Sequence, residues 1–240
     1  MREVKWGMII RAVTFDLDDT LWPFPPIGAR IEQRLHEWLE QYAPRTADTF
    51  PIHRMRQLRH QVDLEHPQHA HDLSMLRRLT IERALAESGE DTALTDAAFE
   101  VFYSERNKVD FYSDAPDAVR RIARLVPIAS LSNGNADLER IGLMPPFRHA
   151  VSATQMGVAK PDPRLFHAAC ALLECEPAQV LHVGDHIEMD VMGALDAGMQ
   201  AAWVNRLGET WPSAYPSPTF TCTELSALAD WLESHSTSTI

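Results

Sequence analysis

The amino-acid sequence predicts an α/β protein in which a doubly wound, Rossmann-like parallel sheet carries an inserted all-helical domain. Three observations support this fold class. Short apolar segments that end in polar residues recur along the chain, as at residues 127–131 and 180–183, and such segments are typical of strands buried in a parallel sheet. Helical periodicity fills the intervals between them. Residues 27–109, in contrast, show helical periodicity and no convincing strand, which indicates an insertion.

The predicted sheet starts near the N-terminus. Val13, Phe15 and Leu17 alternate with the polar residues Thr14 and Asp16, and this alternation is typical of a strand. We expect the segment from Met1 to Phe15 to be this strand, because a signal peptide would end in small residues rather than in an acidic cluster. Strands that alternate with helices form a parallel sheet with right-handed crossovers. The further strands are expected at 127–131, 150–152, 180–183 and 200–204, and the helices between them at 116–125, 164–173, 189–197 and 224–232.

The insertion divides the chain into two predicted domains. Residues 22–112 are expected to form a helical cap of about four helices, and residues 1–21 and 113–240 the α/β core. Prolines at positions 44, 51 and 67 punctuate the cap, as expected where helices begin or end. The chain of 240 residues is long enough to bury a hydrophobic core without disulfides.

The composition excludes several classes of function. The 34 acidic residues outnumber the 22 basic ones, so the formal net charge is -12, and the resulting field repels phosphate backbones and acidic membrane surfaces. We therefore do not expect nucleic acid as a partner. A membrane is not expected either, since no apolar run reaches the roughly 18 residues that cross a bilayer. The three cysteines, Cys170, Cys175 and Cys222, lack a metal-binding spacing. They predict free thiols in a reducing cytoplasm.

Residues with chemical potential lie where predicted strands end. Because the carboxyl ends of parallel strands meet at one edge of a sheet, that edge is the usual place for a ligand. Each segment alone is equally typical of a turn or a helix cap. Their occurrence together, and in this order, indicates a functional site. In chain order the segments are Asp16-Leu17-Asp18-Asp19-Thr20, Ser132-Asn133, Lys160, and Gly184-Asp185 with Asp190.

These four segments resemble, in the same order, the motifs of the haloacid dehalogenase superfamily of hydrolases. The resemblance extends from Arg11 to about Asn205. It implies that Asp16 attacks phosphorus to form an aspartyl phosphate, and that Asp18 protonates the leaving group and then activates water. It also implies a Mg²⁺ ion bound by Asp16, Asp185 and the backbone carbonyl of Asp18, a set of hard oxygen ligands.

The resemblance implies roles for the remaining segments as well. Ser132, the backbone amide of Asn133 and Lys160 are expected to bind the phosphate group of the substrate. Lys160 is also expected to compensate the charge of the nucleophile. Asp190 is expected to orient Lys160 or a water molecule at the metal. Thr20 is interpreted as a helix cap rather than as a site residue.

Within the superfamily, residues 15–22, 132–143 and 182–204 are most similar to bacterial phosphatases that act on flavin mononucleotide and on 5-amino-6-(5-phosphoribitylamino)uracil. The expected partner is therefore a small-molecule phosphate ester of this kind, and a sugar phosphate or nucleotide is the alternative. Trp22, where the chain enters the cap, is a candidate for stacking on a planar ring, whereas packing beneath the cap hinge is the alternative. No pattern in the sequence indicates an oligomeric state.

Other functions share parts of this residue set. A receiver-like phosphoaccepting switch also uses clustered carboxylates, a hydroxyl residue and a lysine, but it lacks the insertion and the Gly-Asp segment. A haloacid dehalogenase keeps Asp16 but needs neither Asp18 as an acid nor Asp185 as a metal ligand. A phosphomutase uses the same core and is kept as an alternative function. Histidines at positions 66, 69 and 71 are interpreted as a polar loop rather than a metal site.

Overall fold

A six-stranded sheet organises residues 10–236, the part of the chain that this computed structural model describes. All neighbouring strands pair in parallel, in the order β3-β2-β1-β4-β5-β6. The predicted fold class is therefore confirmed. The strands are β1 (Ala12–Phe15), β2 (Ile128–Ser132), β3 (His149–Ser152), β4 (Val180–Gly184), β5 (Gln200–Val204) and β6 (Phe220–Cys222).

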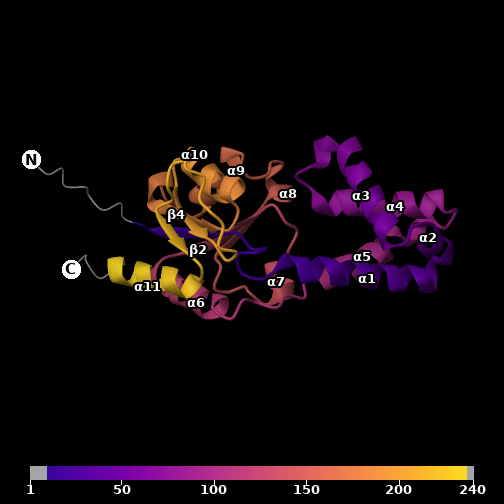
Figure 1. Ribbon diagram of the computed structural model, residues 1–240, viewed down its shortest axis with the longest axis horizontal. Helices are drawn as coiled ribbons and strands as arrows, with labels where there is room; N and C mark the ends of the chain where they lie inside the picture. Colours follow the sequence, from indigo (N-terminus) through magenta and orange to yellow (C-terminus); the bar gives the residue numbers. More distant parts are fainter. Residues whose placement is uncertain (1–9, 237–240) are drawn as a thin grey trace, which may run out of the picture. The chain divides into compact units, whose positions relative to one another are not determined.

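Helices cover both faces of this sheet (Figure 1). Helices α9 (Pro163–Leu172) and α10 (Gly193–Asp196) lie on one side, and α6 (Ala115–Leu125) and α11 (Leu225–Ser236) lie on the other. Every residue of β1, β2, β4 and β5 is consequently buried, which explains their nearly continuous apolar sequences. Shorter helical segments lie between these elements: α8 (Ala153–Met156), η3 (Pro177–Gln179) and η4 (Ile187–Met192).

The chain between β1 and β2 is entirely helical. Prolines separate its first helices, since α1 ends at Tyr42 and α2 begins at Pro44. Five α-helices and two 3₁₀ turns replace the roughly four helices expected from periodicity. Leu39, Leu85 and Ala98 are buried at its centre. Its elements are α1 (Phe24–Tyr42), α2 (Pro44–Thr49), α3 (Ile52–Glu65), η1 (Pro67–His69), α4 (Leu73–Glu87), η2 (Thr92–Leu94) and α5 (Thr95–Arg106).

Two compact units account for the described residues. The core unit comprises residues 10–22, 111–133 and 142–236, and the helical unit comprises residues 23–110 and 134–141. The second segment of the helical unit contains α7 (Leu138–Ile141), although this helix follows β2 in the sequence. Hydrogen bonds tie it there: Arg106 Nε donates to Asn135 Oδ1 at 3.2 Å, and the Asp137 amide donates to Asn107 Oδ1 at 2.7 Å.

Three details of the core differ from the sequence-based expectations. The first strand begins at Ala12, and residues 1–9 of the expected strand lie outside the described residues. Strand β6 was not predicted, because its three residues include only one buried side chain and so carry no apolar pattern. The helix expected at 189–197 is a π-helical segment, η4, followed by α10.

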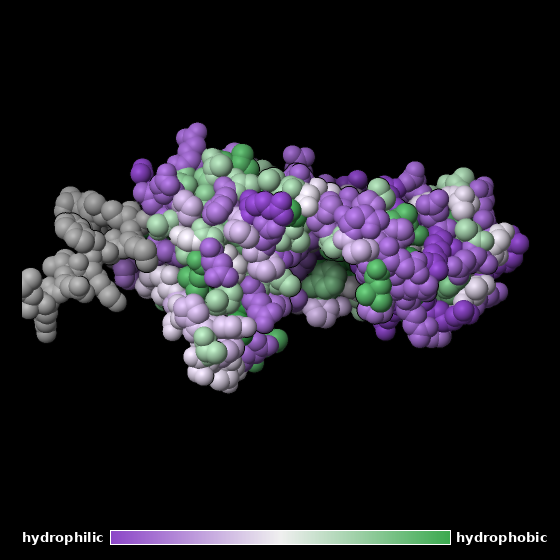
Figure 2. All heavy atoms as spheres, turned by 90° about the horizontal axis from the view of Figure 1, so that it is seen from above, coloured by the Kyte–Doolittle hydropathy of each residue, from purple (hydrophilic) through white to green (hydrophobic). Residues whose placement is uncertain are grey.

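The face of the molecule drawn in Figure 2 is largely polar. No helix within residues 10–236 is long and apolar enough to cross a membrane. Figure 2 shows hydrophilic residues over much of the molecular face that it draws, with hydrophobic residues in separate patches.

Candidate active site

The site begins in a tight loop at the carboxyl end of β1. The Asp19 amide donates to the carbonyl of Trp22 at 2.7 Å, and the Leu21 amide donates to that of Leu17 at 2.8 Å. This reversal requires a left-handed backbone at Asp19, with φ of 58°, a conformation that aspartate tolerates better than most residues. The loop therefore turns the chain directly after Asp16, which keeps the acidic cluster at the edge of the sheet.

Lys160 joins two carboxylates that are far apart in the sequence. Its Nζ donates to Asp16 Oδ1 and to Asp190 Oδ1, each at 2.6 Å. The Lys160 side chain is 3% exposed, so both ion pairs are shielded from solvent. In such surroundings a charged group is tolerated only with partners of opposite charge. The lysine thus fixes the nucleophile candidate relative to Asp190.

The segment after β2 holds Lys160 in place. Asn133 Oδ1 accepts from the Lys160 amide at 2.7 Å, and Asn133 Nδ2 donates to the Lys160 carbonyl at 3.0 Å. The side chain of Asn133 is therefore committed to the backbone of Lys160. Ser132, the last residue of β2, is buried. The structure brings Ser132, Asn133 and Lys160 into the same core unit as the acidic residues.

Asp190 is the centre of a buried hydrogen-bond network. Besides the bond from Lys160, Asp190 Oδ1 accepts a hydrogen bond from His182 Nε2 at 3.2 Å, and Asp190 Oδ2 accepts one from the His186 amide at 2.9 Å. Thr14 Oγ1 lies 2.9 Å from His182 Nδ1. A carboxylate only accepts, so Nε2 of the histidine carries the donated hydrogen. Burial lowers the pKa of His182, and the neutral ring then accepts at Nδ1 from the Thr14 hydroxyl.

Backbone space beside Asp190 exists because residue 184 is glycine. A Cβ atom on Gly184 would lie 2.3 Å from Cγ and 2.6 Å from Cβ of Asp190. These distances are shorter than any real contact of a Cβ atom. The Gly-Asp pair at the end of β4 is therefore a packing requirement of the site, which the sequence showed only as a motif.

Asp185 is held by its own partners. Thr20 Oγ1 donates to Asp185 Oδ1 at 2.9 Å, and Trp203 Nε1 donates to the Asp185 carbonyl at 2.8 Å. Burial raises the pKa of Asp185 to about 6, and the neighbouring Asp190 carboxylate adds to this shift. The ionised carboxylate of Asp185 therefore has too little positive charge around it to offset its burial and the repulsion from Asp190.

The donor set at this edge fits a hard divalent cation. Ligand oxygens of Asp16, Asp185 and Asp190 lie within 4.8 Å of one another. Both oxygens of Asp190 already accept protein hydrogens, so Asp16 and Asp185 are the better ligand candidates. Burial raises the pKa of Asp16 well above its ordinary value even though Lys160 opposes the shift. A cation such as Mg²⁺ would favour the ionised carboxylates, and oxygen ligands suit it.

At Lys160 and Asp190, unlike at Asp16 and Asp185, the pKa shifts favour the charged forms. Burial lowers the pKa of Lys160, but the carboxylates of Asp16 and Asp190 outweigh this effect and raise its pKa above the ordinary value. Burial raises the pKa of Asp190, but Lys160 and His182 outweigh it and leave the pKa well below its usual range. The stable arrangement is thus an ionised Asp190 paired with a charged Lys160.

Trp22 does not form the stacking platform that the sequence allowed. Its side chain is fully buried and packs edge-on against Phe111, with ring centroids 5.5 Å apart. Its indole Nε1 donates to Asp18 Oδ1 at 2.8 Å. A ring that is buried and hydrogen-bonded in this way offers no face to a substrate, so the stacking candidate is wrong and the indole packs instead, as in the alternative.

Four contributors to the site were not identified from the sequence. Thr20 was interpreted as a helix cap, although it belongs to the same Asp-x-Asp-x-Thr run, and this proximity was the available signal. The other three carry no local signal, because their roles depend on which strands are neighbours. They are Thr14 and His182, which support Asp190, and Trp203, which supports the Asp185 backbone.

Comparison with known proteins gives consistent matches. The family described as haloacid dehalogenase-like hydrolase matches residues 10–198. The 5-amino-6-(5-phospho-D-ribitylamino)uracil phosphatase of Escherichia coli is 32% identical over 212 residues, which cover 85% of this chain and 89% of that protein. A phosphoserine phosphatase of Thermus thermophilus is 33% identical over 136 residues, 54% of this chain and 55% of that protein.

A solved structure resembles the whole described fold. The crystal structure of a 2-haloacid dehalogenase from Pseudomonas syringae pv. tomato superposes with a TM-score of 0.88 and is 35% identical, covering 95% of this chain and 100% of that one. The similarity therefore includes both the core unit and the helical unit.

Proposed function

Because the chain belongs to the haloacid dehalogenase-like hydrolase family and is one of its phosphatases, we propose that it hydrolyses a small phosphate monoester through an aspartyl-phosphate intermediate, with Mg²⁺ as cofactor. The observation that carries this proposal is the buried bridge from Asp16 through Lys160 to Asp190. It fixes one carboxylate at the end of β1 and places a cation beside it, as attack on a phosphate group requires.

Two carboxylates divide the chemistry in this proposal. An oxygen of Asp16 attacks phosphorus, and the bond from phosphorus to the leaving oxygen breaks while Asp18 gives that oxygen a proton. Asp18 then removes a proton from a water molecule that attacks the phosphorus of the intermediate. This second step releases inorganic phosphate and restores the Asp16 carboxylate. Acid–base assistance of this kind typically contributes about 10² to 10⁴-fold.

The remaining residues bind and neutralise. Ser132, the backbone amide of Asn133 and Lys160 hold the oxygens of the phosphate group. Asp16, Asp185 and the backbone carbonyl of Asp18 hold Mg²⁺, which supplies Lewis-acid stabilisation of the charge that builds up on the phosphate. Asp190 keeps Lys160 oriented. Free thiols at all three cysteines support a cytoplasmic location.

For the substrate, we propose flavin mononucleotide or a ribityl phosphate of riboflavin synthesis. The support is the relative that acts on 5-amino-6-(5-phospho-D-ribitylamino)uracil, whose alignment covers 85% of this chain. A sugar phosphate or nucleotide is the alternative. A phosphomutase would share the same catalytic residues and differ in transferring the phosphate to an acceptor other than water.

Dehalogenation is the second candidate, because the similar solved structure bears the name of a 2-haloacid dehalogenase. Halide departs without a proton, and displacement of a halide from carbon needs no divalent cation. The hydrogen bonds from Trp22 to Asp18 and from Thr20 to Asp185 hold two carboxylates that dehalogenation would not use. These bonds favour phosphate chemistry.

A comparison of substrates tests the proposal. The measurement is kcat/KM with Mg²⁺ for flavin mononucleotide, the ribitylaminouracil phosphate, sugar phosphates, nucleoside monophosphates and 2-chloropropionate. We expect ribityl phosphates to be the best substrates and Asp16→Asn to remove turnover of all of them. If sugar phosphates exceed them by more than about tenfold, equivalent to about 1.4 kcal/mol, the substrate is misassigned while the phosphatase stands. Chloride release that survives Asp185→Ala would instead identify a dehalogenase.

A further inference from the structure

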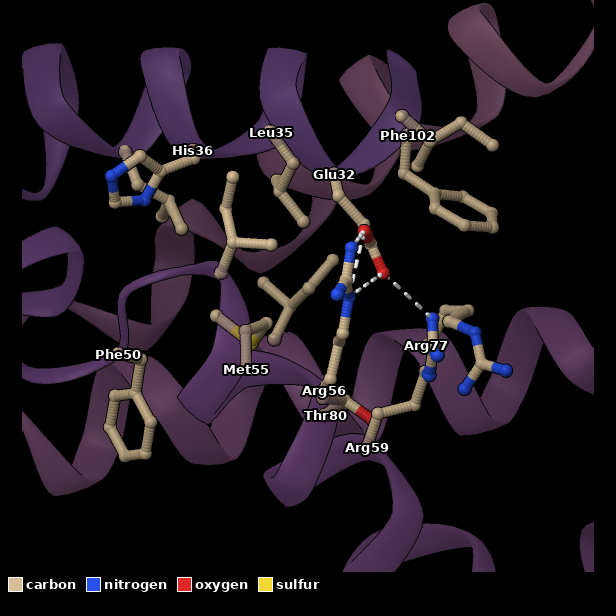
Figure 3. A pocket seen from close by; sticks show the side chains of 14 residues that line it. Glu32, Leu35, His36, Phe50, Met55, Arg56, Arg59, Arg77, Thr80 and Phe102 are labelled. Carbon is tan, nitrogen blue, oxygen red and sulfur yellow. Dashed lines mark hydrogen bonds and ion pairs between the residues drawn. The ribbon is translucent and has the colours of Figure 1, made fainter. Parts of the chain in front are cut away.

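A cavity lies inside the helical unit, and none of its lining residues belongs to the candidate active site. Its volume is about 50 Å³, and helices α1, α3, α4 and α5 supply nearly all of its walls (Figure 3). All of the lining residues belong to the helical unit, so the cavity is a property of that unit alone. Nothing in the proposed phosphatase reaction uses it.

The interior of this cavity is apolar. Ile31, Leu35 and Ile81 line its wall and are nearly fully buried. The Thr80 hydroxyl donates its hydrogen bond to the Leu76 carbonyl of its own helix. Water would therefore find few partners inside, and apolar cavities of this kind stay dry or take up hydrocarbon. A volume of 50 Å³ could hold about four water molecules, which corresponds to the size of a short hydrocarbon chain.

The rim of the cavity, in contrast, carries a surplus of positive charge. Arg56 Nε donates to both oxygens of Glu32 at 2.9 Å, and Arg59 Nη1 lies 3.5 Å from the same carboxylate. One carboxylate thus serves two guanidinium groups, as the dashed lines of Figure 3 show. The third, Arg77, pairs with Asp63 at 3.2 Å. Three cations therefore face two anions, in a chain whose formal net charge is -12.

Arg77 and Arg59 are the groups that an added anion would stabilise. Burial lowers the pKa of Arg77, and the nearby Arg59 guanidinium lowers it further against the effect of Asp63. The Arg77 side chain is 18% exposed, so solvent screens this repulsion only in part. A negative charge between the two guanidinium groups would relieve it and could accept hydrogen bonds from both.

We propose that this cavity is a binding site for a small amphipathic anion, with a hydrocarbon tail of about four carbons among Ile31, Leu35 and Ile81 and a carboxylate held by Arg59 and Arg77. The charge surplus at the rim selects the anionic head, and the dry interior selects the tail. Such a ligand would connect α1, α3 and α4 of the helical unit. Its binding does not depend on the phosphatase assignment, because no residue is shared.

The methyl group of Met55, which lines the cavity, provides a direct probe. We would label the 9 methionine methyl groups with ¹³C in the full chain, assign Met55 by Met55→Leu, and titrate with pentanoate, pentan-1-ol and pentylamine. We expect a saturable shift of the Met55 signal with pentanoate, at a dissociation constant on the order of 1–10 mM. Pentan-1-ol should bind at least tenfold more weakly, and pentylamine should leave the signal unchanged.

Two variants and a matched control test the head group. Arg59→Gln and Arg77→Gln should each weaken pentanoate binding about tenfold without changing the affinity for the alcohol. Arg34 is an exposed arginine of α1 that pairs with Glu37. The control variant Arg34→Gln should change neither the affinity for pentanoate nor the affinity for the alcohol. A Met55 signal that fails to saturate with pentanoate would overturn the site. Equal binding of acid and alcohol, or insensitivity to both arginine variants, would overturn the assignment to an anion.

Discussion

The indole of Trp22 donates a hydrogen bond to Asp18 Oδ1 at 2.8 Å, and its ring is fully buried against Phe111. All three residues lie in the core unit. A bond of this kind limits the rotation of the Asp18 carboxylate, the group proposed to give a proton to the leaving oxygen. If Asp18 is the proposed acid, Trp22 positions that acid rather than binding the ring of a substrate.

Replacement of Trp22 by phenylalanine keeps an aromatic ring but removes the donor. We expect Trp22→Phe to lower kcat for alkyl phosphates by about tenfold, the effect of losing one hydrogen bond to a charged group. p-Nitrophenyl phosphate should lose less, because its leaving group hardly needs a proton. Asp18→Asn should show the same selectivity at about 10² to 10⁴-fold. Steady-state kinetics with both substrates check this, and equal losses on the two substrates would contradict it.

Gly184→Ala tests the close packing between Gly184 and Asp190. The added Cβ atom would lie 2.3 Å from Asp190 Cγ, so the carboxylate must move away from Lys160. We expect kcat to fall by at least about 10²-fold and the free energy of unfolding to fall by about 1–3 kcal/mol, as in other overpacked cores. Gly28→Ala on α1, whose added Cβ atom meets only Phe24 at 3.5 Å, is the control and should keep full activity.

Thr20→Val removes the hydroxyl that donates to Asp185 Oδ1 while conserving the shape of the side chain. We expect the Mg²⁺ concentration needed for half-maximal activity to rise about tenfold, because supports of metal ligands typically contribute 10 to 100-fold to affinity. Thr20→Ser keeps the hydroxyl and should restore most of the affinity. Calorimetric titration of the metal provides a second measurement. If valine and serine behave alike, the hydroxyl does not position Asp185.

The raised pKa of Asp185 predicts opposite effects of acid on the metal-free and metal-bound protein. Without metal, its pKa of about 6 lies above the ordinary 3.8, so the folded state binds the proton more readily than the unfolded state. This carboxyl therefore destabilises the metal-free fold at pH 7, and the penalty is relieved as pH falls through 6. Mg²⁺ must compete with that proton, so its affinity should fall by up to about tenfold per pH unit below 6.

Denaturation and metal titrations between pH 5 and pH 8 separate these effects. Asp185→Asn cannot titrate and is the matched control: its metal-free stability should lose the contribution that depends on pH near 6. Exhaustive chelation of the parent should stop turnover, Mg²⁺ should restore it, and the larger Ca²⁺ should not. A Mg²⁺ affinity that stays constant from pH 7 to pH 5 would argue against Asp185 as a ligand.

Local residue patterns are sufficient to predict five of the six strands in the described residues, together with the polar residues that follow them. Buried parallel strands need apolar side chains on both faces, so β2, β4 and β5 are visible as short apolar segments. The candidate site residues also follow from local residue order, since Asp16 directly follows β1 and Asp185 directly follows β4, with Asp18 two positions beyond Asp16. Strand β6 was not predicted, because an edge strand with one buried side chain does not need apolar side chains on both faces.

The side chains that support the site, in contrast, are brought together by the tertiary fold. Thr14 reaches His182 because β1 pairs with β4 and these two residues are partners in the register, although 168 positions separate them. Lys160 likewise meets Asp16 across 144 positions. Such contacts depend on the order of strands in the sheet and on the space left by a glycine, whereas local periodicity records only whether each residue is buried.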